Sequence, residues 1–322
     1  MLAAKRAIRV AGTQVERTPL LVPSFSSKGF PDVDKILKTT ADVIAGPVLI
    51  SAYDLHYKCI SPPFEFAPLI FLDSGGYEAA RDAELSDYGS REHLPAEWTQ
   101  RFHEEVLKRW TSGSSTIAIS YDHPRERRSI DDQIKRAGEN LGRGNWGKEI
   151  LLKPETTAQA FLQMQSILPR VRDLQDFDVI GVTEKEVGSS ILDRMVNIAK
   201  LRKALLKVGL ETPIHVFGSL DTVTTPLYFL AGADIFDGLT WLRFAYMNGF
   251  TVYKQNYSAL NLSLDTKMHM TDAHCWFNNY RMLLELQQAM RRFLTTRSFD
   301  EFDQHSKSFE RAVKSMIEQV GD

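Results

Sequence analysis

The chain has 322 residues, of which 43% are hydrophobic and 25% charged, and its formal net charge is −2. This composition is typical of a globular protein with a large core, and the near-neutral charge gives no global sign of nucleic-acid binding. The sequence has no apolar stretch long enough to cross a membrane, and residues 1–17 lack the apolar segment of a secretion signal. We therefore expect a cytoplasmic protein without membrane partners.

The cysteine content predicts neither a disulfide framework nor a metal site. Cys59 and Cys275 are the two cysteines, and they lie far apart in the sequence. Such low usage fits a reducing compartment. The sequence also has no CxCxxC or paired CxxC segment, which zinc sites of that kind require. We expect no metal and no cofactor.

Eight short segments rich in Val, Ile and Leu recur between residues 20 and 239. Nearly continuous apolar runs of this kind are typical of strands that are buried on both faces of a parallel sheet. We expect strands at 20–25, 48–54, 69–73, 116–122, 149–153, 177–183, 213–219 and 233–239.

Amphipathic segments between these runs predict helices, at 97–111, 129–141, 156–168 and 187–208. Alternating strands and helices predict an α/β fold, a (β/α)8 TIM barrel over residues 1–250. The link 55–68 has three prolines and is expected to be a loop. Residues 251–322 are expected to form a helical extension packed on the barrel as part of a single domain. We expect it to be irregular over 251–270 and helical over 272–295 and 299–319.

Four of the expected strands end on an aspartate: Asp54, Asp73, Asp122 and Asp237. In a barrel the catalytic groups come from the C-terminal ends of several strands, so these carboxylates would converge on one mouth. Aspartate also commonly follows a strand as a turn or helix-capping residue, an alternative that explains one such position better than four. Two converging carboxylates suit glycosidic chemistry, in which one attacks an anomeric carbon and the other moves a proton.

The strand that ends at Asp73 is followed by a small corner, Ser74-Gly75-Gly76, and then by Tyr77. Glycines beside a carboxylate let a flat ligand approach the backbone. A neighbouring aromatic side chain supplies a stacking face, as base-binding pockets do. The segment therefore predicts a pocket for a planar base.

The segment DSGGY (73–77) resembles the DSGG-aromatic motif of the tRNA-guanine transglycosylases and of their relatives that insert 7-deazaguanines into DNA. Residues 232–243, GADIFDGLTWLR, are similar to the family's second motif, G-x-D-x-F-D, with an arginine six positions after the last aspartate. The TP-x-x-x-P strand at 18–25, the penultimate strand at 213–219 and His274 also match in order. The resemblance covers nearly the whole chain.

The resemblance implies a pentosyltransferase that replaces guanine in DNA or tRNA with a 7-deazaguanine, through a covalent Asp–ribosyl intermediate. Asp237 would attack C1′ of the target nucleoside, and Asp73 would handle the proton of the departing and arriving bases. Asp122 would accept hydrogen bonds from the Watson–Crick edge of the base. The other implied substrate-binding residues are Ser74, Gly75 and Gly76 of the corner, Tyr77 and Phe217 as the stacking walls, Gly218, and Arg243 at the nucleic-acid backbone.

The sequence departs from the family in the residues that hold zinc and read the base. The tRNA enzymes bind zinc through three cysteines and a histidine, of which only His274 has a counterpart here. The segment ILLKP (150–154) lacks the family's glutamine-glycine-glycine element, and Glu78 stands where the family has glutamine. Glu184 and Lys185 either contact the ligand or lie on the surface. The 7-deazaguanine and the polymer stay open, with a tilt towards DNA or an unusual RNA.

Two other functions are compatible with the same residues. A nucleic-acid N-glycosidase would use both aspartates with water as the acceptor. A non-catalytic binding subunit usually loses the catalytic aspartates, whereas Asp73 and Asp237 are both present. The basic segment 123–148 is either a nucleic-acid contact or a solvated helix with flanking loops. A homodimer or a partner protein is a further expectation from the family.

Overall fold

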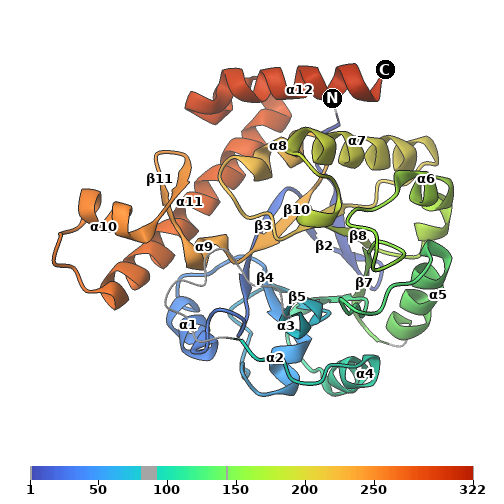
Figure 1. Ribbon diagram of the computed structural model, residues 1–322, viewed down its shortest axis with the longest axis horizontal. Helices are drawn as coiled ribbons and strands as arrows, with labels where there is room; N and C mark the ends of the chain where they lie inside the picture. Colours follow the sequence, from blue (N-terminus) through green and yellow to red (C-terminus); the bar gives the residue numbers. More distant parts are fainter. Residues whose placement is uncertain (1, 81–92, 143, 322) are drawn as a thin grey trace.

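The computed structural model describes residues 2–80, 93–142 and 144–321, and its centre is a closed barrel of eight parallel strands (Figure 1). The strands follow one another around the barrel in the order β10-β3-β4-β5-β6-β7-β8-β9. The predicted (β/α)8 fold is confirmed. The barrel strands are β3 (Leu20–Phe25), β4 (Val48–Ser51), β5 (Leu69–Asp73), β6 (Ser115–Ile119), β7 (Gly147–Leu152), β8 (Val179–Thr183), β9 (Ile214–Phe217) and β10 (Ile235–Gly238).

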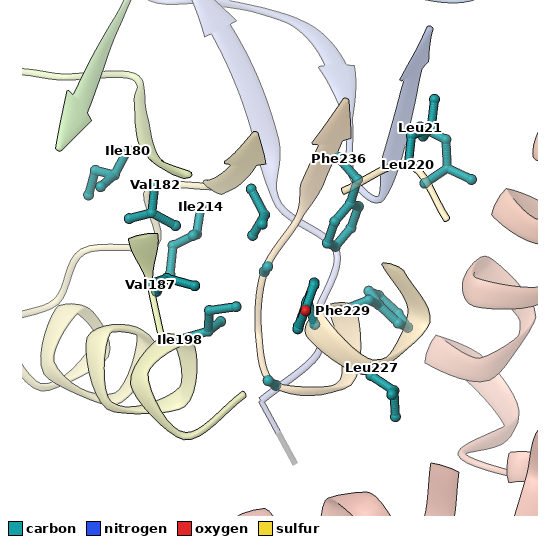
Figure 2. Close-up of a cluster of buried hydrophobic side chains, with 14 of the residues drawn as sticks. Leu21, Ile180, Val182, Val187, Ile198, Ile214, Leu220, Leu227, Phe229 and Phe236 are labelled. Carbon is teal, nitrogen blue, oxygen red and sulfur yellow. The ribbon is translucent and has the colours of Figure 1, made fainter. Parts of the chain in front are cut away.

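Two apolar layers explain why the strands read as continuous apolar runs. Successive side chains of a strand point to opposite faces, so Leu20 and Val22 of β3 fill the barrel interior while Leu21 faces outward. Figure 2 shows the outer layer, in which strand residues such as Val182 and Phe236 lie near Ile198 and Phe229 of the surrounding helices. Both faces of each strand are therefore buried.

Helices surround this barrel on the outside (Figure 1). The expected helices at 97–111, 129–141 and 187–208 are present, but each begins later than predicted. The side chains of Thr99, Ser129 and Ser190 cap their N-termini and so fix where they begin. The helical elements before residue 244 are α1 (Val33–Thr40), α2 (Ala52–His56), α3 (Gly76–Ala79), α4 (Gln100–Arg109), α5 (Ile130–Leu141), α6 (Met164–Ile167), η1 (Leu168–Leu174), η2 (Glu184–Glu186), α7 (Ile191–Lys207), α8 (Thr224–Leu230) and α9 (Thr240–Arg243).

The predicted helix at 156–168 is wrong over most of its length. Only Met164–Ile167 is α-helical, and it continues as a 3-10 helix over Leu168–Leu174. Before it, the side chain of Gln159 accepts the backbone N–H groups of Glu155 and of the next residue. These backbone N–H groups are therefore hydrogen-bonded without a helix. The helical spacing of apolar residues in this segment does not correspond to a helix.

Several predicted strands end earlier than expected, and for two of them the aspartate predicted at the strand end lies beyond it. β4 stops at Ser51, and Asp54 lies in helix α2, so the prediction that Asp54 ends a strand is wrong. The backbone turns from extended at Ser51 to helical at the next residue, which carries the Asp54 carboxylate onto the backbone N–H of Ser27 at 2.8 Å. β6 ends at Ile119, three residues before Asp122.

A hairpin of β1 (Ala7–Val10) and β2 (Thr13–Arg17) lies at the N-terminal ends of the barrel strands, and the sequence did not predict it. Ile8 is fully buried and belongs to the interior apolar cluster. A Cβ on Gly147, where β7 starts, would lie 2.6 Å from the carbonyl oxygen of Arg9. The hairpin therefore closes the end of the barrel opposite the mouth.

The prediction of an irregular segment at 251–270 holds for residues 262–267 and is wrong for most of the rest. β11 (Ala245–Met247) and β12 (Phe250–Val252) form a hairpin, and α10 (Lys254–Asn261) follows it. The hairpin turns at Asn248-Gly249, where both residues have positive φ (52° and 74°). An Asn-Gly pair between strands is the strongest short hairpin signal, so the sequence contained the information.

The C-terminal helices pack on one side of the barrel. They are α11 (Met268–Thr296) and α12 (Ser306–Val320), joined by the 3-10 element η3 (Phe299–His305). α12 lies against α7 and α8, whereas α11 contacts β3 (Figure 1). The Gln287 side chain of α11 accepts the backbone N–H of Leu21 in β3 at 3.1 Å. Across the described residues, no helix combines the length and apolar character that a membrane crossing needs.

Candidate active site

Asp237 lies at the mouth end of β10, and three groups surround its carboxylate. The Ser24 hydroxyl donates to Oδ2 at 2.7 Å, and the Gly218 backbone N–H donates to Oδ1 at 3.1 Å. Nε2 of His215 lies 3.2 Å from the same Oδ1. With only 5% of its surface exposed, Asp237 is a buried carboxylate held in one orientation. Such a group is suited to nucleophilic attack.

Asp73 ends β5 and is also buried, with 7% of its surface exposed. Burial raises the pKa of this carboxyl well above its ordinary 3.8. Three neighbouring carboxylates raise it further, those of Glu78, Asp122 and Asp237. One hydrogen bond, from the Gly75 backbone N–H at 3.3 Å, acts in the opposite direction. Asp73 is therefore able to hold a proton and release it to a substrate.

Asp122 joins the same group of carboxylates but is paired. Its side chain accepts the Ser74 hydroxyl and lies 3.3 Å from the Lys153 ammonium. Burial alone would raise the pKa of Asp122, but Lys153 and the Ser74 hydroxyl together lower it. Lys153 also donates to Thr183 at 2.8 Å and to Glu186 at 2.9 Å. Asp122 is therefore an ionised acceptor in a hydrogen-bonded network.

The two glycines of the corner make room for side chains of the protein itself. Gly75 has a φ of +81°, and a Cβ there would lie 2.8 Å from Cβ of Tyr53 and 2.9 Å from the Trp98 ring. A Cβ on Gly76 would collide with the Asp122 carboxylate. Close packing therefore explains both glycines, and the left-handed backbone is a second reason at Gly75.

The two predicted stacking walls, Tyr77 and Phe217, each have one ring face covered. Lys28 Nζ lies 4.4 Å from the centroid of the Tyr77 ring, and the His215 ring stacks on Phe217 with centroids 4.0 Å apart. Arg243 donates to the Tyr77 hydroxyl at 2.6 Å, which anchors this ring at the mouth. Arg243 thus acts on a predicted wall of the pocket.

Glu78 lies behind the corner, with 2% of its surface exposed. Its two carboxylate oxygens accept the hydroxyls of Ser26 and Ser51. Burial and the nearby Asp54 raise the pKa of Glu78 to about 7. Burial also raises the pKa of Asp54 to about 6. Glu78 therefore ties the corner to β4 and to the residue that follows β3, which is a structural reason for an acid at this position.

Sequence analysis missed Ser24 and Lys153, which contact the site carboxylates, and also the pair Glu149 and His215. Both are fully buried, and His215 Nδ1 lies 2.8 Å from Glu149 Oε1. Burial by itself would lower the pKa of His215, but the Glu149 and Asp237 carboxylates raise it to about 9. The available signal was an ionisable residue inside an apolar strand segment, since such residues are rarely buried without a partner.

Glu184 does not join the mouth carboxylates, because it pairs with Arg194 at 3.0 Å and with the Tyr228 hydroxyl at 2.8 Å. His274 contacts the Tyr257 hydroxyl at 3.3 Å, beside the buried Cys275. Within residues 2–80, 93–142 and 144–321, no three or more His, Cys, Asp or Glu side chains are grouped so that they could hold a metal ion.

The structure thus brings Asp73, Asp122 and Asp237 together with the corner, Phe217 and Gly218. The Asp237 carboxylate has His215 beside it and accepts two hydrogen bonds, from Ser24 and Gly218. The pKa of Asp73, in contrast, is raised by burial and by neighbouring carboxylates. The two carboxyl groups therefore lie in different environments at the same barrel mouth. Comparisons with protein-family models and with curated proteins found no match to this chain.

Proposed function

We propose that this protein is a base-exchange enzyme that replaces guanine in DNA or tRNA with a 7-deazaguanine by double displacement. The observation that carries the proposal is the contrast between Asp237 and Asp73 at one barrel mouth. Asp237 is oriented by Ser24, Gly218 and His215, and the pKa of Asp73 is raised by burial and like charges. The motif resemblance around both residues supports the same assignment.

In the first step, Asp237 attacks C1′, a bond from C1′ to the carboxylate oxygen forms, and the bond to guanine N9 breaks. Asp73 gives its proton to the departing base. In the second step, the incoming base loses a proton to Asp73 and attacks C1′, and the Asp237 carboxylate leaves. Two inversions retain the β configuration, and the polymer backbone stays intact.

Asp122 and the aromatic residues are the groups we propose for base binding. The Asp122 carboxylate accepts hydrogen bonds, so it suits the N–H donors on the Watson–Crick edge of a guanine-like base. Lys153 lies beside it, in the segment where the family carries its glutamine. Its three donors already face Asp122, Thr183 and Glu186, so we propose that it acts on the base indirectly, by keeping Asp122 ionised as an acceptor.

The test is exchange of labelled free guanine into DNA and, separately, into tRNA. Asp237→Asn keeps the shape of the side chain and removes the nucleophile. We expect it to abolish both the label in the polymer and the covalent adduct on a denaturing gel, a fall of about 10⁴-fold or more.

Asp178→Asn is the matched control. This aspartate precedes β8 at the opposite end of the barrel, where it accepts the Lys148 backbone N–H at 2.8 Å. The control should retain exchange. Wild-type rates in Asp237→Asn would contradict the proposed function.

The same assay separates the other two candidates by mass balance. Abasic sites without incorporated base indicate an N-glycosidase. Polymer binding with neither product indicates a binding subunit. A solution size measurement tests the expected homodimer, which is independent of the chemistry.

A further inference from the structure

Three ionisable side chains form a line through the barrel interior and end at Asp237. Glu149 comes from β7, His215 from β9 and Asp237 from β10. Nδ1 of His215 lies 2.8 Å from Glu149 Oε1, and its Nε2 lies 3.2 Å from Asp237 Oδ1. The histidine ring therefore bridges a fully buried carboxylate and the mouth carboxylate.

The strand between β7 and β9 is shaped to permit this bridge. β8 places Gly181 beside His215 in the strand register. A Cβ on Gly181 would lie 2.9 Å from Glu149 Oε1 and 2.6 Å from the Phe217 ring. The missing side chain lets Glu149 reach across β8, and any larger residue would displace the contact between Glu149 and His215 or the ring that covers it.

Each ring nitrogen of His215 lies close to a carboxylate oxygen, but the two contacts differ. Nδ1 is hydrogen-bonded to Glu149, whereas Nε2 lies 3.2 Å from Asp237 Oδ1 as a charge contact without hydrogen-bond geometry. A neutral imidazole has one N–H, whereas an imidazolium has two. In the described part of the chain, the titratable groups that face His215 are Glu149 and Asp237. The adjacent strand β8 presents Gly181 to the ring, and β5, from across the barrel, presents Phe71. The contacts therefore favour the charged ring, and the rise of its pKa to about 9 agrees.

We propose that Glu149 and His215 form a fixed-charge support for Asp237, in which His215 is a positioning residue held as an imidazolium by Glu149. This inference rests on the proposed function. When Asp237 attacks C1′, its carboxylate becomes a neutral ester, and the imidazolium then faces Glu149 alone. When the ester breaks, the negative charge returns to Asp237 beside the cation. No proton passes through His215.

The support predicts an effect on one step of the reaction. A cation beside a carboxylate stabilises it as a leaving group more than it assists the same carboxylate as a nucleophile. Removing the cation should therefore slow breakdown of the covalent intermediate more than its formation. The adduct should accumulate relative to product, whereas a merely structural defect would lower both together.

The first test needs no substrate. Histidine ring signals in an NMR titration, assigned with His215→Gln, report whether His215 is charged. We expect an imidazolium at pH 7.5 in the wild type. Glu149→Gln keeps an acceptor for Nδ1–H and removes the charge, so the midpoint should fall by at least about one pH unit. Asp237→Asn should also lower it, and Glu184→Gln, whose carboxylate pairs with Arg194, should leave it unchanged.

The second test is rapid-quench kinetics on the nucleic-acid substrate. In Glu149→Gln we expect the steady-state ratio of adduct to product to rise about tenfold, the equivalent of one pKa unit. A neutral His215 in the wild type at pH 7.5 would overturn the inference, as would an unchanged ratio in Glu149→Gln. If the wild type forms no adduct, the proposed function is wrong and the positioning role fails with it, while the titration still decides whether the support is charged.

Discussion

The two ends of the barrel bury carboxylates in opposite ways. At the closed end, Asp234 precedes β10 and forms ion pairs with Arg6 at 2.7 Å and with Arg202, and it accepts the Ile214 backbone N–H at 2.8 Å. At the mouth, the main charged neighbours of Asp73 are other carboxylates. One end therefore neutralises its buried charge, and the other concentrates it.

This difference separates stability from chemistry. A buried carboxylate with cationic partners is costly to disturb, because its removal leaves charges without compensation. A carboxylate among like charges stays ready to bind a proton, which is a property of catalytic sites and is often obtained at the expense of stability. The contrast predicts that replacing a buried aspartate with asparagine lowers the free energy of unfolding at the closed end and raises it at the mouth.

Asp234→Asn should have the largest effect on stability. It leaves the buried Arg6 and Arg202 without their common anion, so we expect the free energy of unfolding to fall by about 3–5 kcal/mol. Urea unfolding measures this change. As a control, Glu285→Gln breaks an exposed pair with Arg281 and should cost less than about 1 kcal/mol. Equal decreases in the free energy of unfolding in the two variants would contradict the inference that the buried ion pairs of the closed end stabilise the fold.

Stability should fall as the pH rises from 6.5 to 9. The pKa of His215 is about 9 in the folded chain and ordinarily 6.5, so its stabilisation is complete below 6.5 and is lost as the pH rises through 9. The difference corresponds to about 3 kcal/mol. Glu78, with a pKa of about 7 instead of 4.5, acts in the same direction at lower pH.

Urea unfolding at a series of pH values measures this slope. In Glu149→Gln the pKa of His215 should move towards its ordinary value, and the slope between pH 6.5 and 9 should flatten. A wild-type free energy of unfolding that rises between pH 6.5 and 9 would show that His215 is not held in its charged form.

Asp73→Asn should stabilise the protein while it damages catalysis. The substitution removes a carboxylate that burial and like charges disfavour, so we expect a gain of about 1–2 kcal/mol that grows with pH. Loss of the proton donor should lower base exchange by about 10²–10⁴-fold. Unfolding and exchange assays on the same preparation test both signs. Destabilisation at pH 9 would mean that the two ends of the barrel do not differ as described.

The barrel could be predicted from the sequence because each strand is buried on both faces. Segments such as 20–25 and 69–73 are buried throughout and apolar except at Ser24 and Asp73, and their bounds agree with the structure. The mouth position of Asp73 and Asp237 followed from strand ends alone. Parallel strands in a closed barrel leave few alternatives for where such residues lie.

Other features depend on contacts that no local pattern encodes. The segment 156–168 has a helical period, but the Gln159 side chain satisfies the backbone in another conformation. Glu149 and His215 lie 66 positions apart, and only the absence of a side chain at Gly181 brings them together. The Asn248-Gly249 turn, by contrast, is encoded locally, because this residue pair favours a tight hairpin turn with positive φ.

Closure of the barrel also sets an order of events during synthesis. The first barrel strand, β3, pairs with the last, β10. Leu20 can therefore pair with Ile235 only after about 215 more residues have been synthesised. At ribosomal rates of about 5–20 residues per second, this delay is about 10–40 s. Until then an apolar strand has an unpaired edge, which other chains can recognise. A newly made chain therefore has an open sheet, and the edge of β3 is exposed to pairing with other chains until β10 is synthesised.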